Sequence, residues 1–393
     1  MTTQRLDTLK NRAGAAIDVQ ADALREAALA LSRQPELSYH EVESARRLAD
    51  FLEARGFAVQ RGVGGLETAF KATLDSGKPG PTIAFIAEYD ALPGVGHGCG
   101  HNLIAAGALG AGLGAQAVLQ DLGGRIVVFG TPAEEYSNNP QGKILLLKAG
   151  AFAGLDACLM FHPWTFSAPI NSSLAFIAFD VVFHGQTAHA SGDPWNGRNA
   201  LDAVIMTFNG ISALRQQVQP DVRIHGIVTD GGVVPNIIPE RGAARFMLRA
   251  RKFEDVKKIL ARVKGCIEGA ALATDTTFDL DVRCETADTL ALPALQALTR
   301  ANFAALGLPF GEPAEWTAST DFGDVSYVIP SDSFFISLGA GPIPWHSTDV
   351  AHAATQEPAL RAMLAGAKVL AMNAIDLLAD PALLQQARRE MPR

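Results

Sequence analysis

The stretch EYDALPGVGHGCGHNL, residues 88–103, follows the apolar run PTIAFIA and precedes an apolar segment rich in alanine and glycine. It contains two carboxylates, two histidines, one cysteine and four glycines. The run before it predicts a buried strand and the segment after it predicts a helix, so the polar residues lie where a strand ends. In an open α/β sheet, ligands bind beyond the carboxyl ends of the strands, which makes this loop the first candidate for a functional site.

The alternation of strand and helix continues along the chain. RIVVFG (residues 125–130) and LDACLMFH (residues 155–162) are further candidate strands, with the helical run KILLLKAGAF between them. Helices are expected within residues 16–56 and again after about residue 290, where SFFISL is one more strand. Apolar strands joined by crossover helices predict an α/β fold with a mostly parallel sheet flanked by helices.

Residues 173–287 follow a different pattern. The long alternating strand AFIAFDVVF leads into a helix, two strands, a second helix and the strand TTFDLDVRC, which predicts an α+β unit of one sheet and two helices. We therefore expect a discontinuous catalytic domain, residues 1–172 and 288–393, interrupted by an inserted domain, residues 173–287. AFIAFDVVF is so apolar that we expect it at a sheet edge, covered by a second copy of the chain across a two-fold axis.

The composition is that of a soluble globular protein with a sizeable core. Hydrophobic residues make up 48% and charged residues 19%, and 33 Lys and Arg against 41 Asp and Glu give a net charge of −8 without a basic stripe, so nucleic acid is not an expected partner. The N-terminus lacks the apolar region of a secretory signal, and LIAAGALGAGLGAQAVL is expected to be a core helix rather than a membrane span. Four scattered cysteines predict reduced thiols and a cytoplasmic protein.

Three of the predicted strands end in side chains that bind transition metals. Cys99 and His101 follow the first strand, Glu134 and Glu135 follow the second, and His162 ends the third. On an extended segment Cys99 and His101 project to the same side, so a pair of metal ions can share them. Adjacent buried carboxylates repel each other unless a cation lies between them, so one of the two glutamates is expected to bind metal while the other acts as general base.

The chain resembles the dinuclear-metal amidohydrolase and peptidase family that contains carnosinase-like dipeptidases, hippurate hydrolases and auxin-conjugate hydrolases. The motifs that carry the resemblance are EYDALPGVGHGCGHNL, GTPAEE, FHPW, HGQTAHASGDPWNGRNALDA, GGVVPNIIPE and STDFGDVSYVIPS. They extend from about residue 35 to about residue 350. The Cys-Gly-His-Asn segment is similar to the branch of aminobenzoyl-glutamate hydrolase subunits and β-alanyl-lysine type dipeptidases.

The resemblance implies a metal centre and a mechanism. Two divalent transition metal ions (zinc, manganese, cobalt or nickel) would be held, and Glu134 would be the base that activates a metal-bound water. The cysteine would bridge the two ions, which leaves Asp90 to orient a ligand. His346 has the spacing of the family's last ligand, and His352 is the alternative. The implied ligands are Cys99, His101, Glu135, His162 and this late histidine.

The resemblance also implies roles for the inserted domain. It would form a homodimer in which His189 reaches the active site of the partner subunit and stabilises the oxyanion. Asn236 and Arg249 match positions that help to hold substrate. The expected reaction is hydrolysis of the amide bond in an N-acyl or N-aroyl amino acid or a small dipeptide.

Two other classes of protein remain open. A cysteine-nucleophile hydrolase would use Cys99 with His101 or His97 as base, but it would leave both glutamates and His162 unexplained. A non-catalytic metal-binding protein would keep the ligands without turnover. The glycines of GVGHGCG alternate and do not form G-x-G-x-x-G, which argues against nucleotide binding.

Overall fold

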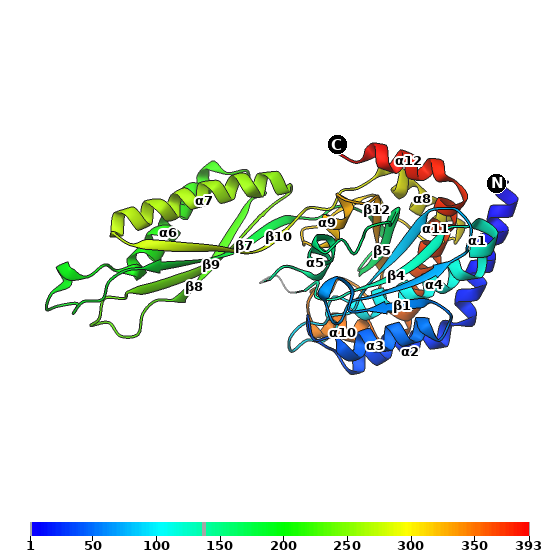
Figure 1. The fold of residues 1–393 in the computed structure, drawn as a ribbon, viewed down its shortest axis with the longest axis horizontal. Coiled ribbons are helices and arrows are strands. Elements are labelled where there is room, and N and C mark those ends of the chain that lie inside the picture. The colour runs from blue at the N-terminus through cyan, green and yellow to red at the C-terminus, as the bar shows by residue number, and fades with distance from the viewer. Residues whose placement is uncertain (1, 136–138, 393) are drawn as a thin grey trace.

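The computed structural model describes residues 2–135 and 139–392 and arranges them as two bodies, each built on its own sheet (Figure 1). The larger body holds both ends of the chain, and the smaller body extends away from it. This is the expected α/β fold with an inserted α+β unit.

The larger body contains an eight-stranded sheet in the order β1-β2-β4-β3-β5-β12-β6-β11. Its strands are β1 (Ala58–Arg61), β2 (Phe70–Asp75), β3 (Thr82–Glu88), β4 (Arg125–Thr131), β5 (Ala157–Trp164), β6 (Ala168–Ser172), β11 (Ala314–Glu315) and β12 (Ser331–Ser337). The neighbours β4, β3, β5 and β12 run parallel, whereas β1 with β2, β2 with β4 and β6 with β12 are antiparallel. The strands predicted from PTIAFIA, RIVVFG and LDACLMFH are β3, β4 and β5, so the prediction of a mostly parallel core is confirmed.

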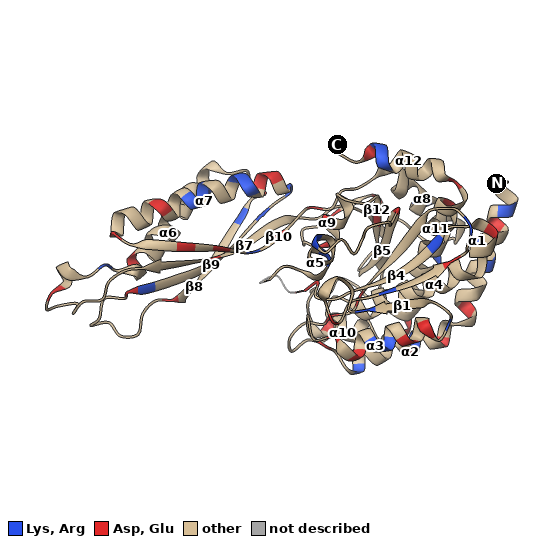
Figure 2. Ribbon diagram, in the orientation of Figure 1, with Lys and Arg blue, Asp and Glu red and all other residues tan. Residues whose placement is uncertain are grey.

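Helices flank this sheet. They are α1 (Thr3–Val19), α2 (Ala21–Arg33), α3 (Val42–Glu53), α4 (His101–Leu122), α5 (Gly142–Lys148), α8 (Pro293–Ala305), α9 (Phe322–Ser326), α10 (Thr348–Ala353), α11 (Glu357–Ala379) and α12 (Pro381–Glu390), with a 3₁₀ turn at Val63–Gly65. Acidic and basic side chains are interspersed over α2, α3 and α12 (Figure 2). This mixing agrees with the lack of a basic stripe in the sequence.

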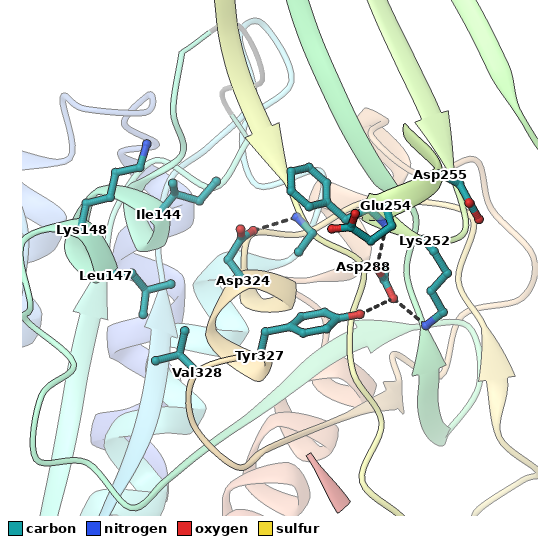
Figure 3. Close-up of a pocket in the computed structure, with 12 residues that line it drawn as sticks. Ile144, Leu147, Lys148, Lys252, Glu254, Asp255, Asp288, Asp324, Tyr327 and Val328 are labelled. Carbon is teal, nitrogen blue, oxygen red and sulfur yellow. Dashed lines mark hydrogen bonds and ion pairs between the residues drawn. The ribbon is translucent and has the colours of Figure 1, made fainter. Parts of the chain in front are cut away.

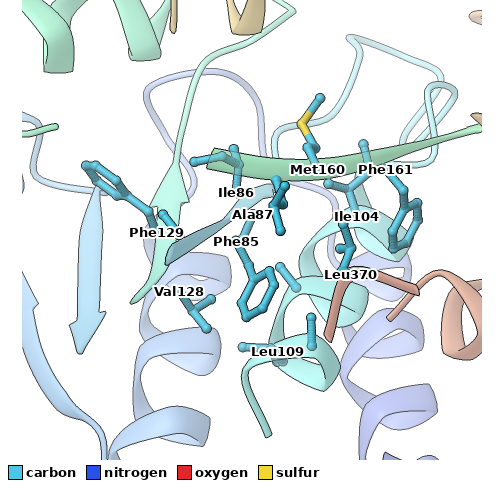
Figure 4. Packing of buried hydrophobic residues seen from close by; sticks show 14 of the residues in the cluster. Phe85, Ile86, Ala87, Ile104, Leu109, Val128, Phe129, Met160, Phe161 and Leu370 are labelled. Carbon is cyan, nitrogen blue, oxygen red and sulfur yellow. The ribbon is translucent and has the colours of Figure 1, made fainter. Parts of the chain in front are cut away.

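The core of the larger body is formed by α4 and α11 against the central strands. Figure 4 shows Ile104 and Leu109 of α4 and Leu370 of α11 among side chains of β3, β4 and β5. Small residues permit this packing, since a Cβ on Gly107 would lie 2.3 Å from the ring of Phe161. By length and composition α4 and α11 could each cross a membrane, yet 89% and 78% of their most apolar windows are buried inside the protein. The segment predicted as a core helix is therefore a core helix.

The smaller body is a four-stranded antiparallel sheet, ordered β10-β7-β9-β8, with two helices packed against it. Its elements are β7 (Ala175–His184), α6 (Ala200–Leu214), β8 (Arg223–Asp230), β9 (Arg241–Ala250), α7 (Phe253–Thr274) and β10 (Thr277–Thr286), with 3₁₀ turns at Pro194–Asn196 and Arg215–Gln217. In Figure 1 α6 and α7 lie on the same side of this sheet. We call this body the lid.

The expectation that AFIAFDVVF forms a sheet edge is wrong. This segment is β7, which pairs with β10 on one side and with β9 on the other. It is apolar because its residues, such as Phe179 and Val181, form the centre of the lid core. The edges are β10 and β8, and β8 exposes Ile227 and Val228, which are 62% and 49% accessible.

Two segments connect the lid to the larger body. Ser173 Oγ and Thr289 Oγ1 lie 2.8 Å apart, so the outgoing and returning segments are hydrogen-bonded to each other. The Leu174 amide donates to the Ala318 carbonyl oxygen of the larger body at 2.8 Å. These hydrogen bonds join the two connecting segments to each other and to the larger body.

A cavity of about 660 Å³ lies beside the returning segment, lined by α5, α9 and the start of α7 (Figure 3). In it the buried Asp288 accepts hydrogen bonds from Lys252 Nζ, the Phe253 amide and Tyr327 Oη. The cavity is lined by none of the ligands expected from the sequence. It therefore belongs to the junction between the bodies and not to the expected metal centre.

Candidate metal centre

Side chains from three strand ends and a late loop meet at the carboxyl edge of the large sheet. Cys99 and His101 follow β3, the two glutamates follow β4, and His162 lies near the end of β5. Their ligand atoms form three groups, each with all atoms within 4.8 Å of one another: Cys99 with His101 and His162, Cys99 with Glu135 and His346, and His101 with Glu134 and Glu135. The first two groups share Cys99, as a ligand that bridges two cations requires.

The segment that carries Cys99 and His101 is not extended, contrary to the expectation from their spacing. Cys99 lies in a turn and His101 is the first residue of α4. Gly100 between them has a left-handed backbone, with φ of 78°, and a Cβ there would lie 3.0 Å from Pro163. Glycine adopts this conformation readily, so the two side chains converge through a turn and not along a strand.

Each of the two buried histidines has one ring nitrogen, Nδ1, within hydrogen-bond distance of an oxygen atom. His101 Nδ1 lies 3.0 Å from Asp90 Oδ1, and His162 Nδ1 lies 2.7 Å from the Pro163 carbonyl oxygen. These contacts place the N–H on Nδ1 and leave the lone pair of Nε2 available to a metal ion. Although burial opposes ionisation of Asp90, hydrogen bonds from His101 and from the Glu135 amide hold its pKa at about 2. Asp90 is thus hydrogen-bonded to His101, and its role in orienting that ring stays a prediction.

The donor set fits divalent transition metal ions. His101 Nε2 and Glu135 Oε1 are buried without a hydrogen-bond partner among residues 2–135 and 139–392. Buried polar atoms are normally paired, so these two atoms suit a cation. Thiolate sulfur, imidazole nitrogen and carboxylate oxygen together favour zinc and its neighbours over magnesium or calcium.

Glu134 and Glu135 face His101 from the end of β4. One oxygen of each lies 3.8 Å from His101 Nε2. Burial, and after it the charges of Glu88 and Glu135, raises the pKa of Glu134 well above its usual value. Burial raises the pKa of Glu135 to about 7. Two carboxyl groups in this arrangement can have different roles, since one can bind a cation while the other accepts a proton.

His346, and not His352, lies beside this cluster. His346 Nε2 is 3.5 Å from Glu135 Oε2. His352 is exposed on α10 and belongs to none of the candidate ligand groups in the described part of the chain. The backbones of His346 and of Ala133, which precedes Glu134, are left-handed, with φ of 59° and 58°. Such residues cost about 1–3 kcal/mol each and concentrate at functional sites.

A buried ion-pair network behind the cluster was not anticipated from the sequence. Lys143, at the start of α5, is inaccessible to solvent, and its Nζ lies 2.6 Å from Glu88 Oε1 and 2.5 Å from Asp321 Oδ1. Glu88 Oε2 in turn lies 3.6 Å from His101 Nε2. The only available signal was a lysine at the start of the apolar run KILLLKAGAF. Its partners are too distant in sequence to be assigned from that pattern.

The candidate residues of the lid lie at its two ends. His189 and Asn236 are on adjoining loops at the surface, where the Ala190 amide donates to the Asn236 carbonyl oxygen at 3.0 Å. These loops lie beyond the end of β7 that is remote from the larger body. Arg249 lies at the junction end, where its Nη1 donates to Ser319 Oγ at 3.2 Å. The structure therefore does not bring His189 or Asn236 to the metal cluster of their own chain.

Relatives resemble this chain over most of its length. It is 37% identical to the Xaa-Arg dipeptidase of Mus musculus, over 98% of this chain and 92% of that protein. It is 31% identical to one of the p-aminobenzoyl-glutamate hydrolase subunits of Escherichia coli strain K12, over 91% of this chain and 89% of that protein. Residues 173–275 match the M20 family profile described as a peptidase dimerisation domain.

Solved structures share the fold. A putative aminohydrolase from methicillin-resistant Staphylococcus aureus superposes with a TM-score of 0.80 at 21% identity, covering 94% of this chain and 100% of that one. A dinuclear metal binding peptidase of the M20 family from Bacillus subtilis superposes with a TM-score of 0.71 at 20% identity, covering 92% and 99%. At sequence identities of 20–21%, these superpositions show that the fold is shared.

Fold, donor set and relatives together define a metal-dependent hydrolase. The chain belongs to the M20 family of peptidases and amidohydrolases. It is accordingly an enzyme that acts on amide or peptide bonds and uses divalent metal. The family resemblance of the sequence motifs is confirmed.

Proposed function

We propose that this enzyme hydrolyses the amide bond of an N-acyl or N-aroyl amino acid or of a small dipeptide, with two divalent transition metal ions per chain. The observation that carries the proposal is the pair of ligand groups that share Cys99. The names of the relatives, a dipeptidase and an aminobenzoyl-glutamate hydrolase, support this class of substrate. The ligands are Cys99, His101, Glu135, His162 and His346.

The residues of the chain have separate parts in the reaction. When bound, the metal ions would act as Lewis acids that polarise the substrate carbonyl and acidify the attacking water. The carboxylate of Glu134 takes a proton from that water and delivers it to the leaving amine nitrogen. Burial raises the pKa of Glu134 in the metal-free chain, and bound cations would lower it and keep the carboxylate ionised, as a base requires. Asp90 and the Pro163 carbonyl oxygen hold the two buried histidines in orientation.

The lid, residues 173–287, is proposed to form a homodimer in which His189 donates a hydrogen bond to the oxyanion in the site of the partner subunit. His189 Nδ1 accepts from the Gly192 amide at 3.0 Å, so the N–H lies on Nε2, which is then a donor. The ten residues of β7 separate this loop from the junction by about 30 Å. That distance favours action in trans. Asn236, beside His189, and Arg249, at the junction, are proposed to hold the substrate.

Metal analysis tests the proposed centre. The purified enzyme should contain two divalent metal ions per chain, and Cys99→Ser and His101→Ala should lose metal and activity. Cys266→Ser, a half-buried thiol of α7 in the lid, is the matched control and should retain both. Retention of both metal ions and full activity by the first two variants would show that the ligands are misassigned.

Glu134→Gln tests the base. Loss of a general base lowers kcat by roughly 100- to 10,000-fold, and the variant should keep its metal ions. A variant that loses metal instead would make Glu134 a ligand.

The substrate is found by assaying N-acyl amino acids, aroyl-glutamates, auxin conjugates and β-alanyl dipeptides, with zinc, manganese, cobalt and nickel supplied in turn. We propose a cytoplasmic enzyme whose partners are these small molecules and a second copy of itself.

A cysteine nucleophile is a less suitable reading of the same cluster. Burial raises the pKa of the Cys99 thiol, whereas an activated nucleophilic cysteine has a lowered pKa and partial exposure. A thiol enzyme would survive chelation and be inactivated by iodoacetamide, which is the opposite of the result expected here.

A further inference from the structure

Cys99 has a hydrogen-bond donor that is not one of the expected ligands. The indole Nε1–H of Trp345 donates to Cys99 Sγ across 3.3 Å. The same sulfur lies 3.4 Å from His162 Nε2. Trp345 immediately precedes His346, so the residue that contacts the sulfur and the proposed late ligand are neighbours on one loop.

The backbone provides a second contact between the same two segments. The His346 amide donates to the Gly98 carbonyl oxygen at 3.1 Å. A Cβ on Gly98 would lie 3.1 Å from the Ser347 carbonyl oxygen and 2.6 Å from Val95, so a side chain at this position would force the segments apart. The loop that carries His346 is thus joined to the cysteine loop by one backbone and one side-chain hydrogen bond.

Neighbouring rings fix the orientation of the Trp345 indole. Its centroid lies 4.2 Å from that of Trp164 and 6.1 Å from that of His162. Trp164 is stacked in turn on Phe335, with centroids 5.3 Å apart. Packed aromatic rings have few rotamers, so the N–H remains directed at the sulfur.

We propose that Trp345 is a positioning residue whose indole N–H donates a hydrogen bond to the Cys99 thiolate in the metal-loaded enzyme, fixing the thiolate and lowering its electron donation to the metal ions. The proposal rests on the proposed function, in that Cys99 is taken as a metal ligand. A thiolate that bridges two cations retains a lone pair for such a donor. Groups that hydrogen-bond to ligands tune metal affinity and the charge on the ligand atom.

Cobalt substitution tests this proposal apart from catalysis. Co²⁺ is loaded into four proteins: wild type, Trp345→Phe, Trp164→Phe and Cys99→Ser. Absorption spectra give the thiolate-to-cobalt charge-transfer band, and titration against a chelator gives the Co²⁺ affinity. Trp345→Phe removes the N–H and keeps a ring, whereas Trp164→Phe alters the packing and keeps the N–H at Cys99. Trp195→Phe, on the lid and 75% exposed, controls for the substitution itself.

Trp345→Phe should move the band to longer wavelength, because the sulfur lone pairs rise in energy when the hydrogen bond is lost. It should also weaken Co²⁺ binding by roughly 10- to 100-fold, because the loss of a fixed thiolate position outweighs the stronger electron donation of the sulfur. Trp164→Phe and Trp195→Phe should keep the wild-type band. An unmoved band with unchanged affinity in Trp345→Phe, or an equal shift in Trp164→Phe, overturns the proposal.

The failure of the proposed function has a different signature. If wild type shows no charge-transfer band and Cys99→Ser binds Co²⁺ equally well, Cys99 is not a ligand, and both proposals fail together. If Trp345→Phe does not fold, Trp345→Met removes the same donor with a flexible apolar side chain. The same shift then supports the proposal, and an unmoved band overturns it.

Discussion

Lys143→Met tests the importance of the ion-pair network behind the metal cluster. Lys143 is fully buried, and its ammonium group lies within 2.6 Å of a carboxylate oxygen of both Glu88 and Asp321. Although burial opposes ionisation of Glu88, this ammonium brings the pKa of that carboxyl below its usual value. Methionine has a similar volume and would retain the packing of the lysine stem, but it would leave two buried carboxylates facing each other without a cation.

The expected loss follows from the burial of all three groups. Removing one partner of a buried ion pair costs about 3–5 kcal/mol, because the remaining charge is neither solvated nor paired. Lys148→Met, on the exposed last turn of the same helix, changes the same residue type at a surface position. It should stay within about 0.5 kcal/mol of wild type.

The free energy of unfolding is measured by urea denaturation of metal-free protein at pH 7.5. Adding Asp321→Asn to Lys143→Met removes one of the two unpaired carboxylates and should recover part of the loss. A loss of less than about 1 kcal/mol in Lys143→Met, or one equal to that of Lys148→Met, would refute the reasoning. It would mean that water or a proton replaces the ammonium at little cost.

Three further outcomes are expected. His189→Ala should lower kcat by roughly 100- to 1,000-fold with metal content unchanged. Mixing this variant with Glu134→Gln should restore one working site per heterodimer. A mixed dimer without activity would contradict the proposal that His189 acts in the site of the partner subunit. Ile227→Lys, on the exposed edge β8, should shift the protein to monomers in sedimentation if this edge pairs between subunits, and an unchanged dimer excludes β8. Burial raises the pKa of Asp332 to about 7, so between about pH 4 and pH 7 the folded protein retains a proton that the unfolded chain releases, and stability falls as the pH rises through this range. Asp332→Asn should therefore flatten the fall in urea midpoints between pH 4 and 8. An unchanged slope would contradict this assignment.

The strands and the ligand segments could be predicted because their patterns are local. PTIAFIA, RIVVFG and LDACLMFH are apolar almost throughout, as strands buried on both faces must be. All the proposed ligands except the late histidine lie in the segments that follow the first two strands or, in the case of His162, near the end of the third. The preference for His346 over His352 came from the spacing that the resembled family shows, and His346 is the one that lies beside Glu135.

The errors concern features that depend on distant parts of the chain. An apolar strand such as β7 is equally consistent with a paired edge and with a sheet interior, and the choice depends on β9 and β10, which follow more than 50 residues later in the chain. The convergence of Cys99 and His101 depends on the left-handed turn at Gly100, whereas the spacing of two suggested a strand. The partners of Lys143 could not be predicted because they come from β3 and from the turn before α9.

The surplus of buried acidic groups gives a physical reason for the metal ions. Glu88, Asp90, Glu134 and Glu135 are gathered around His101, and Lys143 is paired with Glu88 and Asp321, so acidic side chains outnumber basic ones in this part of the described structure. Without cations, burial raises the pKa of Glu134 and Glu135, which favours the protonated, neutral form of both carboxyl groups. Two divalent cations would offset most of the negative charge of these carboxylates and of the Cys99 thiolate, and would keep both glutamates ionised. Glu135 can then serve as a ligand and Glu134 as a base, although the two are adjacent in the chain and share the same strand end.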